Sequence, residues 1–383
     1  MKHKRQRSIL PRLLLLTAFA GASSGVGHAA EYFWSGGTGT YNNPAGWGGT
    51  VPGPGDDALN NSGLANILQI NPGDPDWTVS DLTAGGSAEG VSGAIEQNGQ
   101  VVTVNSWLHI GAGTNATGVY TLNGGTLNVR NGRLFLGEAP GTTATLNING
   151  GVLNKSGDIF TIADGGWNGP GERTGTVNQN GGVVNSTSEI WIGQVSPGLA
   201  FYNLHAGSIN SSNWFVVARS GSTGTLNMDG GSILQVSGGQ PAFIVADNGV
   251  GTLNFSAGSI STIGAEFWIG NGNDGVGTNN MSGTASLLVD NWIAVGRGGL
   301  GVLNLSGGWI TKTGNGNLIM SGEGIINQTG GAITNLSGDT WIPEGGRGTW
   351  NLDDGVAILG RLELSHVGGA QGFFNLNGGL LRA

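Results

Sequence analysis

Cysteine is absent from the 383-residue sequence. This absence excludes disulfide bonds, thiolate metal sites and cysteine nucleophiles, so stability must come from packing. Charge is also sparse: Asp, Glu, Lys and Arg make up 10% of the chain, with 24 acidic residues against 15 basic ones. Since acidic residues outnumber basic ones and the chain is negatively charged, we expect no nucleic-acid partner.

The first 29 residues have the pattern of a secretory signal peptide. Basic residues between Lys2 and Arg12 flank an apolar run at residues 13–20, and small residues follow up to Ala29. This pattern predicts cleavage after Ala29 and a secreted or cell-surface location. No later stretch approaches the roughly 18 consecutive apolar residues of a membrane helix, so we expect no transmembrane segment in the mature chain.

Glycine is abundant, at 77 residues, and part of it lies in a repeated Leu-Asn-x-x-Gly-Gly pattern. The first glycine position of this pattern falls at 124, 150, 181, 206, 230, 257, 283, 307, 330, 354 and 378, with Ala at 206 and 257 and Asp at 354. The mean spacing of about 25 residues is typical of a solenoid and too short for a propeller blade of about 40 residues.

Each repeat contains three short segments with strand character. One ends at a small residue and alternates as in Leu108 and Ile110; the second contains the Leu-Asn pair; the third is a brief apolar segment after the glycines, as at Leu127. A period of two indicates strands with one buried face. The sequence therefore predicts an all-β fold, a parallel β-helix of about 11 coils of roughly 25 residues.

The Asn of the repeat forms a column. The eleven repeats have Thr121, Asn147, Asn178, Asn203, Asn227, Asn254, Asn280, Asn304, Asn327, Asn351 and Asn375 at this position. In stacked coils these amides are expected to form a hydrogen-bonded ladder. The alternative is that each Asn serves its own turn before the glycine pair.

Three segments are expected along the chain. Residues 1–29 are the signal peptide, residues 30–100 form an N-terminal cap with irregular first coils, and residues 101–383 form the repeat domain. The sequence stops within a repeat at Ala383. We expect that the repeat domain is truncated there; the alternative is that another chain covers the last coil.

The segment from Trp34 to Ala58, with Trp-Ser-Gly-Gly, a second Trp and Gly-Asp-Asp-Ala, precedes repeats such as Gly-Thr-Leu-Asn-Met-Asp-Gly-Gly at 224–231. Together they resemble bacterial secreted β-helix proteins of the autotransporter-associated repeat type. The resemblance implies a right-handed, pectin-lyase-like helix at the cell surface and implies no reaction. The chain departs from that family because it shows neither a sorting tail nor an outer-membrane barrel.

Seven aromatic residues occupy the second or fourth position before the small residue that ends the first strand of the repeat. These positions form the face opposite the aliphatic residues. The seven residues are Trp107, Phe135, Trp191, Trp214, Trp268, Trp292 and Trp341. We expect them to form a solvent-facing stripe along one side of the rod, which would suit the stacking of sugar rings. The alternative is that a turn covers these rings or that they pack on each other.

Catalytic, cofactor and metal residues are not expected. Asp229 lies five coils from Asp353 and Asp354, too far for paired acid chemistry on one sugar bond. His109, His205 and His366 fall at different phases of the repeat. The Gly-rich stretch at 270–275 resembles a calcium-binding turn, but a single copy is more typical of a loop.

These observations favour a secreted or cell-surface structural, adhesin-like protein that is not an enzyme and binds a polysaccharide or a neighbouring cell surface. The alternative is a carbohydrate-active enzyme of the β-helix class, either a polysaccharide lyase or a glycosidase.

Overall fold

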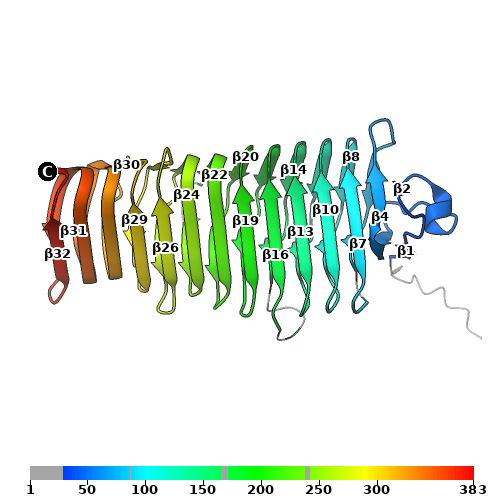
Figure 1. The fold of residues 1–383 in the computed structure, drawn as a ribbon, viewed down its shortest axis with the longest axis horizontal. Coiled ribbons are helices and arrows are strands. Elements are labelled where there is room, and N and C mark those ends of the chain that lie inside the picture. Colours follow the sequence, from blue (N-terminus) through cyan, green and yellow to red (C-terminus); the bar gives the residue numbers. More distant parts are fainter. Residues whose placement is uncertain (1–28, 87, 165–168, 170, 238–241) are drawn as a thin grey trace, which may run out of the picture.

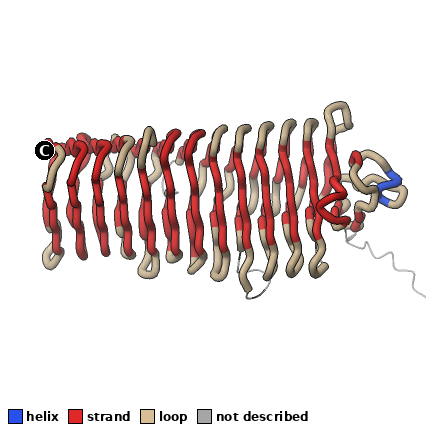
Figure 2. The backbone as a smooth tube through the Cα atoms, in the orientation of Figure 1, coloured by secondary structure: helices blue, strands red, loops and turns tan. Residues whose placement is uncertain are grey.

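The computed structural model describes residues 29–383 except 87, 165–168, 170 and 238–241. All but the last residue of the predicted signal peptide lies outside this part of the chain. The described chain winds into an elongated rod of about 14 stacked coils, with the N-terminal segment at one end and the C-terminus at the other (Figure 1). Strands occupy the long sides of each coil and loops its corners (Figure 2).

The coils pair in parallel and in register, which confirms the predicted β-helix. The strands form three stacks, here called sheets 1, 2 and 3. Sheet 1 contains the Leu-Asn segments and comprises β2 (Gly39–Thr40), β4 (Ser62–Ile70), β7 (Ser92–Gln97), β10 (Thr117–Leu122), β13 (Thr143–Ile148), β16 (Thr174–Gln179), β19 (Leu199–Leu204), β22 (Thr223–Val236), β24 (Val250–Ile263), β26 (Val276–Met281), β29 (Leu300–Leu305), β31 (Leu318–Leu364) and β32 (Gln371–Leu376).

Sheets 2 and 3 use the shorter strands. Sheet 2 comprises β5 (Trp77–Val79), β8 (Val101–Val104), β11 (Thr126–Val129), β14 (Val152–Lys155), β17 (Val183–Ser186), β20 (Ser208–Ser211), β27 (Ser286–Val289), β30 (Trp309–Lys312) and β33 (Leu380–Arg382), with later parts of β22, β24 and β31. Sheet 3 comprises β1 (Glu31–Phe33), β3 (Asp57–Asn60), β6 (Leu82–Ala84), β9 (Leu108–Ile110), β12 (Leu134–Leu136), β15 (Phe160–Ile162), β18 (Ile190–Ile192), β21 (Phe215–Arg219), β23 (Phe243–Asp247), β25 (Phe267–Asn271), β28 (Ile293–Val295) and the start of β31.

The number of coils exceeds the predicted 11 because coils also form before residue 101. Strands β3, β4 and β5 pair with β6, β7 and β8, and these pair with the first coil that has the glycine motif. The early coils lack the Leu-Asn-x-x-Gly-Gly signature, so this pattern does not predict them. A single 3₁₀ helix, η1 (Pro44–Trp47), also lies in this N-terminal segment.

Aliphatic and aromatic side chains fill the interior as the alternation predicts. On sheet 3 the inward residues are buried in every coil from β6 to β28. Phe215, Phe243 and Phe267 stack on one another in successive coils, with ring centroids 4.7 and 5.1 Å apart. Stacked rings in register give the core a continuous apolar column.

The Asn column forms a ladder. Nine hydrogen bonds of 2.7–3.0 Å connect Asn147 to Asn375, and in each one Nδ2 donates to Oδ1 of the preceding coil. Asn147 in turn donates to Thr121 Oγ1 at 3.4 Å. These Asn residues lie within strands, while the second glycine of the motif takes the positive φ that the turn requires, as Gly231 does at 66°. The ladder prediction is confirmed.

Candidate functional site

The aromatic residues predicted to form a stripe lie in the strands of sheet 3 or directly before them, but they are not a solvent-facing surface. Phe135, Trp191 and Trp268 are buried, the last two at 6% and 5% exposure. Trp107, Trp214, Trp292 and Trp341 are half-buried. The expectation of an open stripe was therefore wrong, and the alternative of rings covered by other groups describes most of it.

Arginines and neighbouring rings provide the cover. The guanidinium of Arg219 lies 4.4 Å from the ring centre of Trp191, and that of Arg297 lies 3.7 Å from the ring centre of Trp268. The rings of Trp214 and Trp268 pack edge to face, with their centroids 5.8 Å apart. Arg219 is the last residue of β21 and Arg297 follows β28, each in the coil after its tryptophan. The position of each arginine over a ring therefore depends on a contact between repeats that a single repeat does not reveal.

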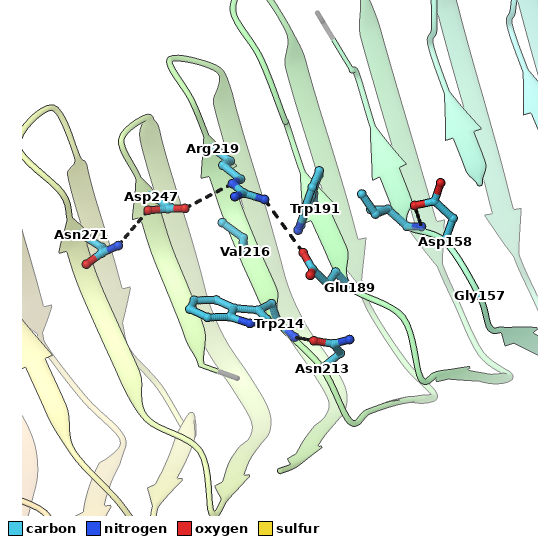
Figure 3. A pocket seen from close by; sticks show the side chains of 11 residues that line it. Gly157, Asp158, Glu189, Trp191, Asn213, Trp214, Val216, Arg219, Asp247 and Asn271 are labelled. Atoms are coloured by element: carbon cyan, nitrogen blue, oxygen red, sulfur yellow. Dashed lines mark hydrogen bonds and ion pairs between the residues drawn. The ribbon is translucent and has the colours of Figure 1, made fainter. Parts of the chain in front are cut away.

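A hollow of about 570 Å³ on sheet 3 lies around Trp191 and Trp214. Its remaining polar lining comes from five successive coils: Asp158, Glu189, Asn213, Arg219, Asp247 and Asn271. Arg219 lies between two carboxylates, with Nε 3.3 Å from Asp247 and a terminal nitrogen 3.9 Å from Glu189 (Figure 3). Asn271 Nδ2 donates to Asp247 Oδ1 at 2.8 Å.

Apolar and polar groups are combined in this hollow in the way that small-ligand sites require. Two indole rings and Val216 line one part of it, while carboxylates, amides and a guanidinium surround them. Such a mixture binds ligands that have both apolar faces and hydroxyl groups. Sequence reasoning found Trp191 and Trp214 but missed Glu189, Arg219, Asp247 and Asn271.

A second hollow, of about 530 Å³, lies near the N-terminal end of the same sheet. His109 Nδ1 lies 2.7 Å from Glu138 Oε2, and the side chains of Asp57 and Asp81 line the same hollow. Burial raises the pKa of the Asp57 carboxyl, and the neighbouring Asp81 carboxylate raises it further. Asp57 Oδ1 also accepts the backbone N–H of Asp81 at 3.2 Å, which gives it a structural role as well.

The other titratable groups considered from the sequence are dispersed. His205 pairs with Asp229 at 2.7 Å and His366 with Glu363 at 3.0 Å, each on the surface. Asp353 accepts from Asn377 and Asp354 from the backbone of Gly355. Within the described residues, no three His, Asp or Glu side chains are placed to hold a metal ion.

The glycine-rich stretch at 270–275 comprises the last two residues of β25 and the turn that follows it. Asn271 turns toward Asp247, and Gly270 and Gly272 both have positive φ. No helix in the described part of the chain is long and apolar enough to cross a membrane.

Comparison with known proteins gives no match: no protein-family model, no curated protein and no solved structure corresponds to the chain. The fold and the geometry of sheet 3 are therefore the basis for assigning a function.

Proposed function

We propose that this protein is a secreted or cell-surface structural rod, adhesin-like in character, that binds polysaccharide along sheet 3. The observation that carries the proposal is the hollow in which Trp191 and Trp214 are surrounded by Glu189, Arg219 and Asp247. Sugar rings offer apolar faces to indoles and hydroxyl groups to carboxylates and amides.

The arrangement of the hollows favours a polymer over a single sugar. Three hollows lie on sheet 3, around His109, around Trp214 and around Trp292. Because sheet 3 extends along the rod, an extended chain could contact several of them at once. Multiple weak contacts along one ligand raise the overall affinity without any single deep pocket.

Binding assays with Trp214→Ala provide the test. Wild-type protein should bind at least one soluble plant or bacterial polysaccharide in affinity electrophoresis or calorimetry, and Trp214→Ala should weaken that binding about tenfold, since an aromatic contact and its hydrophobic area are lost. The matched control is Trp309→Ala, because Trp309 is 52% exposed and belongs to sheet 2. Equal effects of both substitutions, or no binding to any polysaccharide, would refute the proposal.

The hollow around His109 supports a second candidate function, that of a carbohydrate-active enzyme. A carboxyl group with a raised pKa beside a His–Glu pair offers both an acid and a base. Time-resolved release of reducing sugars or unsaturated products that is abolished by Glu138→Gln would establish this function in place of simple binding.

A further inference from the structure

A Glu-x-Trp sequence occurs twice on sheet 3, and each copy has an arginine in the following coil. The first triad comprises Glu189, Trp191 and Arg219, and the second triad comprises Glu266, Trp268 and Arg297. The two tryptophans share one column, since Trp191 pairs with Val216, Val216 with Ile244 and Ile244 with Trp268. The triads are therefore equivalent in position and three coils apart.

The second triad is closed. Trp268 Nε1 donates to Glu266 Oε2 at 2.6 Å, and Arg297 donates to the same oxygen at 2.8 Å. The guanidinium also lies 3.7 Å from the ring centre of Trp268. Each polar group of this triad thus has a partner inside the triad.

The first triad is open. Arg219 lies 3.9 Å from Glu189, beyond hydrogen-bond distance, and 4.4 Å from the ring centre of Trp191. Among the described residues, Trp191 Nε1 is buried and has no hydrogen-bond partner. A buried N–H without a partner is unfavourable, which makes this group a ready donor for a ligand.

Asp247 accounts for the difference between the two triads. It lies in the coil after Arg219, in direct register with it, and attracts the Arg219 Nε to 3.3 Å. Counting on from the Val295–Met320 pair, the corresponding residue after Arg297 is Gly322, which has no carboxylate. Arg219 therefore lies between the carboxylates of Glu189 and Asp247, whereas Arg297 forms its ion pair with Glu266.

From this comparison we infer that the first triad is a subsite for the hydroxyl groups of an uncharged sugar. A hydroxyl there accepts from Trp191 Nε1 and donates to the Glu189 carboxylate, which replaces the bond that Trp268 makes to Glu266. The lining has three carboxylates, from Asp158, Glu189 and Asp247, which face two guanidinium groups: Arg219, and Arg133, whose Nε lies 3.0 Å from Asp158. This excess of negative charge disfavours uronic acids and other anionic sugars. The inference rests on the proposed polysaccharide binding and specifies its ligand.

The test is a substitution that lets Trp191 and Arg219 bond to Glu189, as in the second triad, with a side chain of nearly the same size. Asp247→Asn removes the competing charge, so Arg219 should turn to Glu189 and Trp191 should bond to it as in the second triad. Affinity for a bound neutral polysaccharide should fall about tenfold or more, the range expected for lost hydrogen bonds to a charged group. Asp229→Asn is the matched control, because Asp229 pairs with His205 outside sheet 3 and its loss should leave affinity unchanged.

The indole N–H resonances give a second measurement. Addition of the neutral polysaccharide should shift the Nε1–H signal of Trp191, identified with Trp191→Phe, and leave that of Trp268 in place. If wild-type protein binds no polysaccharide, the proposed function itself fails. If it binds but Asp247→Asn binds equally well, or if the Trp191 signal does not move, the subsite is wrong and the broader function stands. Tighter binding of polygalacturonate than of neutral chains would overturn the ligand class.

Discussion

Asn227 Nδ2 donates a 2.8 Å hydrogen bond to Asn203 Oδ1 in the preceding coil, and it accepts an equivalent bond of 2.9 Å from Asn254 in the following coil. Every bond of this ladder has the same direction, with the donor on the C-terminal side. Amides in such a chain polarise one another, so each bond strengthens its neighbours.

Asn227→Ala should lower the free energy of unfolding by about 1–2 kcal/mol, because two ladder bonds are lost in the middle of the chain of amides. Denaturant unfolding monitored by circular dichroism measures this change. Asn375→Ala removes a single bond, to Asn351, and should cost about half as much. A larger loss for Asn375→Ala would contradict the role assigned to the ladder.

Lys155 lies at 1% exposure inside the rod and donates to the carbonyl oxygens of Gly132 and Ser156 at 2.8 and 2.7 Å. Burial lowers its pKa from 10.5 to about 8, while the nearby Asp158 carboxylate opposes the shift. Since the unfolded chain then binds more protons than the folded one between about pH 8 and 10.5, stability should rise with pH in this window. Each pKa unit corresponds to about 1.4 kcal/mol.

The comparison with Lys155→Met isolates this effect. Lys312 has a pKa lowered by burial in the same direction, so the variant should retain a smaller rise than the wild-type protein. Burial raises the pKa of Tyr120 and Tyr202, whose contributions are lost only as pH rises above about 10. Unfolding midpoints are therefore best compared between about pH 8 and 9.5, and identical slopes for the two proteins would exclude Lys155 as the cause.

The hydroxyl of Tyr202 donates to Gln179 Oε1 at 2.6 Å inside the rod. Tyr202→Phe should lower the free energy of unfolding by about 1–3 kcal/mol, because the Gln179 carbonyl oxygen is left buried without that donor. The double variant Tyr202→Phe with Gln179→Leu should recover part of this loss, as Leu204 occupies the same column in the next coil. Purely additive losses in the double-mutant cycle would show that the pair is not coupled.

Two glycines with positive φ, Gly48 and Gly270, distinguish the cost of backbone strain from the cost of a steric clash when each is replaced by Ala. Gly48→Ala should cost about 1 kcal/mol, because φ is 75° but no atom lies within 4 Å of the new methyl group. Gly270→Ala should cost considerably more, since its methyl group would lie 2.1 Å from the carbonyl oxygen of Leu300 in the next coil. Thermal unfolding compares the two; equal losses would mean that the coils separate easily at this corner.

Sequence periodicity predicted the features that repeat in every coil. Residues such as Leu134 and Leu136 are buried as the alternation required, and Asn304 bonds to Asn280 as the column required. These features follow from one repeat and the rule that equivalent residues stack. Stacking in register is a strong constraint, so a single period was sufficient to define both the core and the ladder.

Features that differ between coils were not predictable in this way. Lys155 occupies an inward position at which Val129 stands one coil earlier, and its burial depends on the carbonyl groups of the adjacent turn. Likewise, the lack of a hydrogen-bond partner for Trp191 Nε1 depends on Arg219 and Asp247, which lie one and two coils further on. The sequence analysis predicted Trp191 and Trp268 as members of one column, but it did not predict the glutamate and arginine beside each of them or the difference between the two triads.

In the described residues, each coil pairs with the coil before it and the coil after it. Deletion or duplication of one whole repeat would therefore join surfaces that already match, and the rod can change length in steps of about 4.8 Å. Distances along the rod are therefore set in whole coils, and Trp191 and Trp268 are three coils apart. A repeat gained or lost between them would change the distance between these two tryptophans by one coil, about 4.8 Å, and the backbone pairing would stay intact.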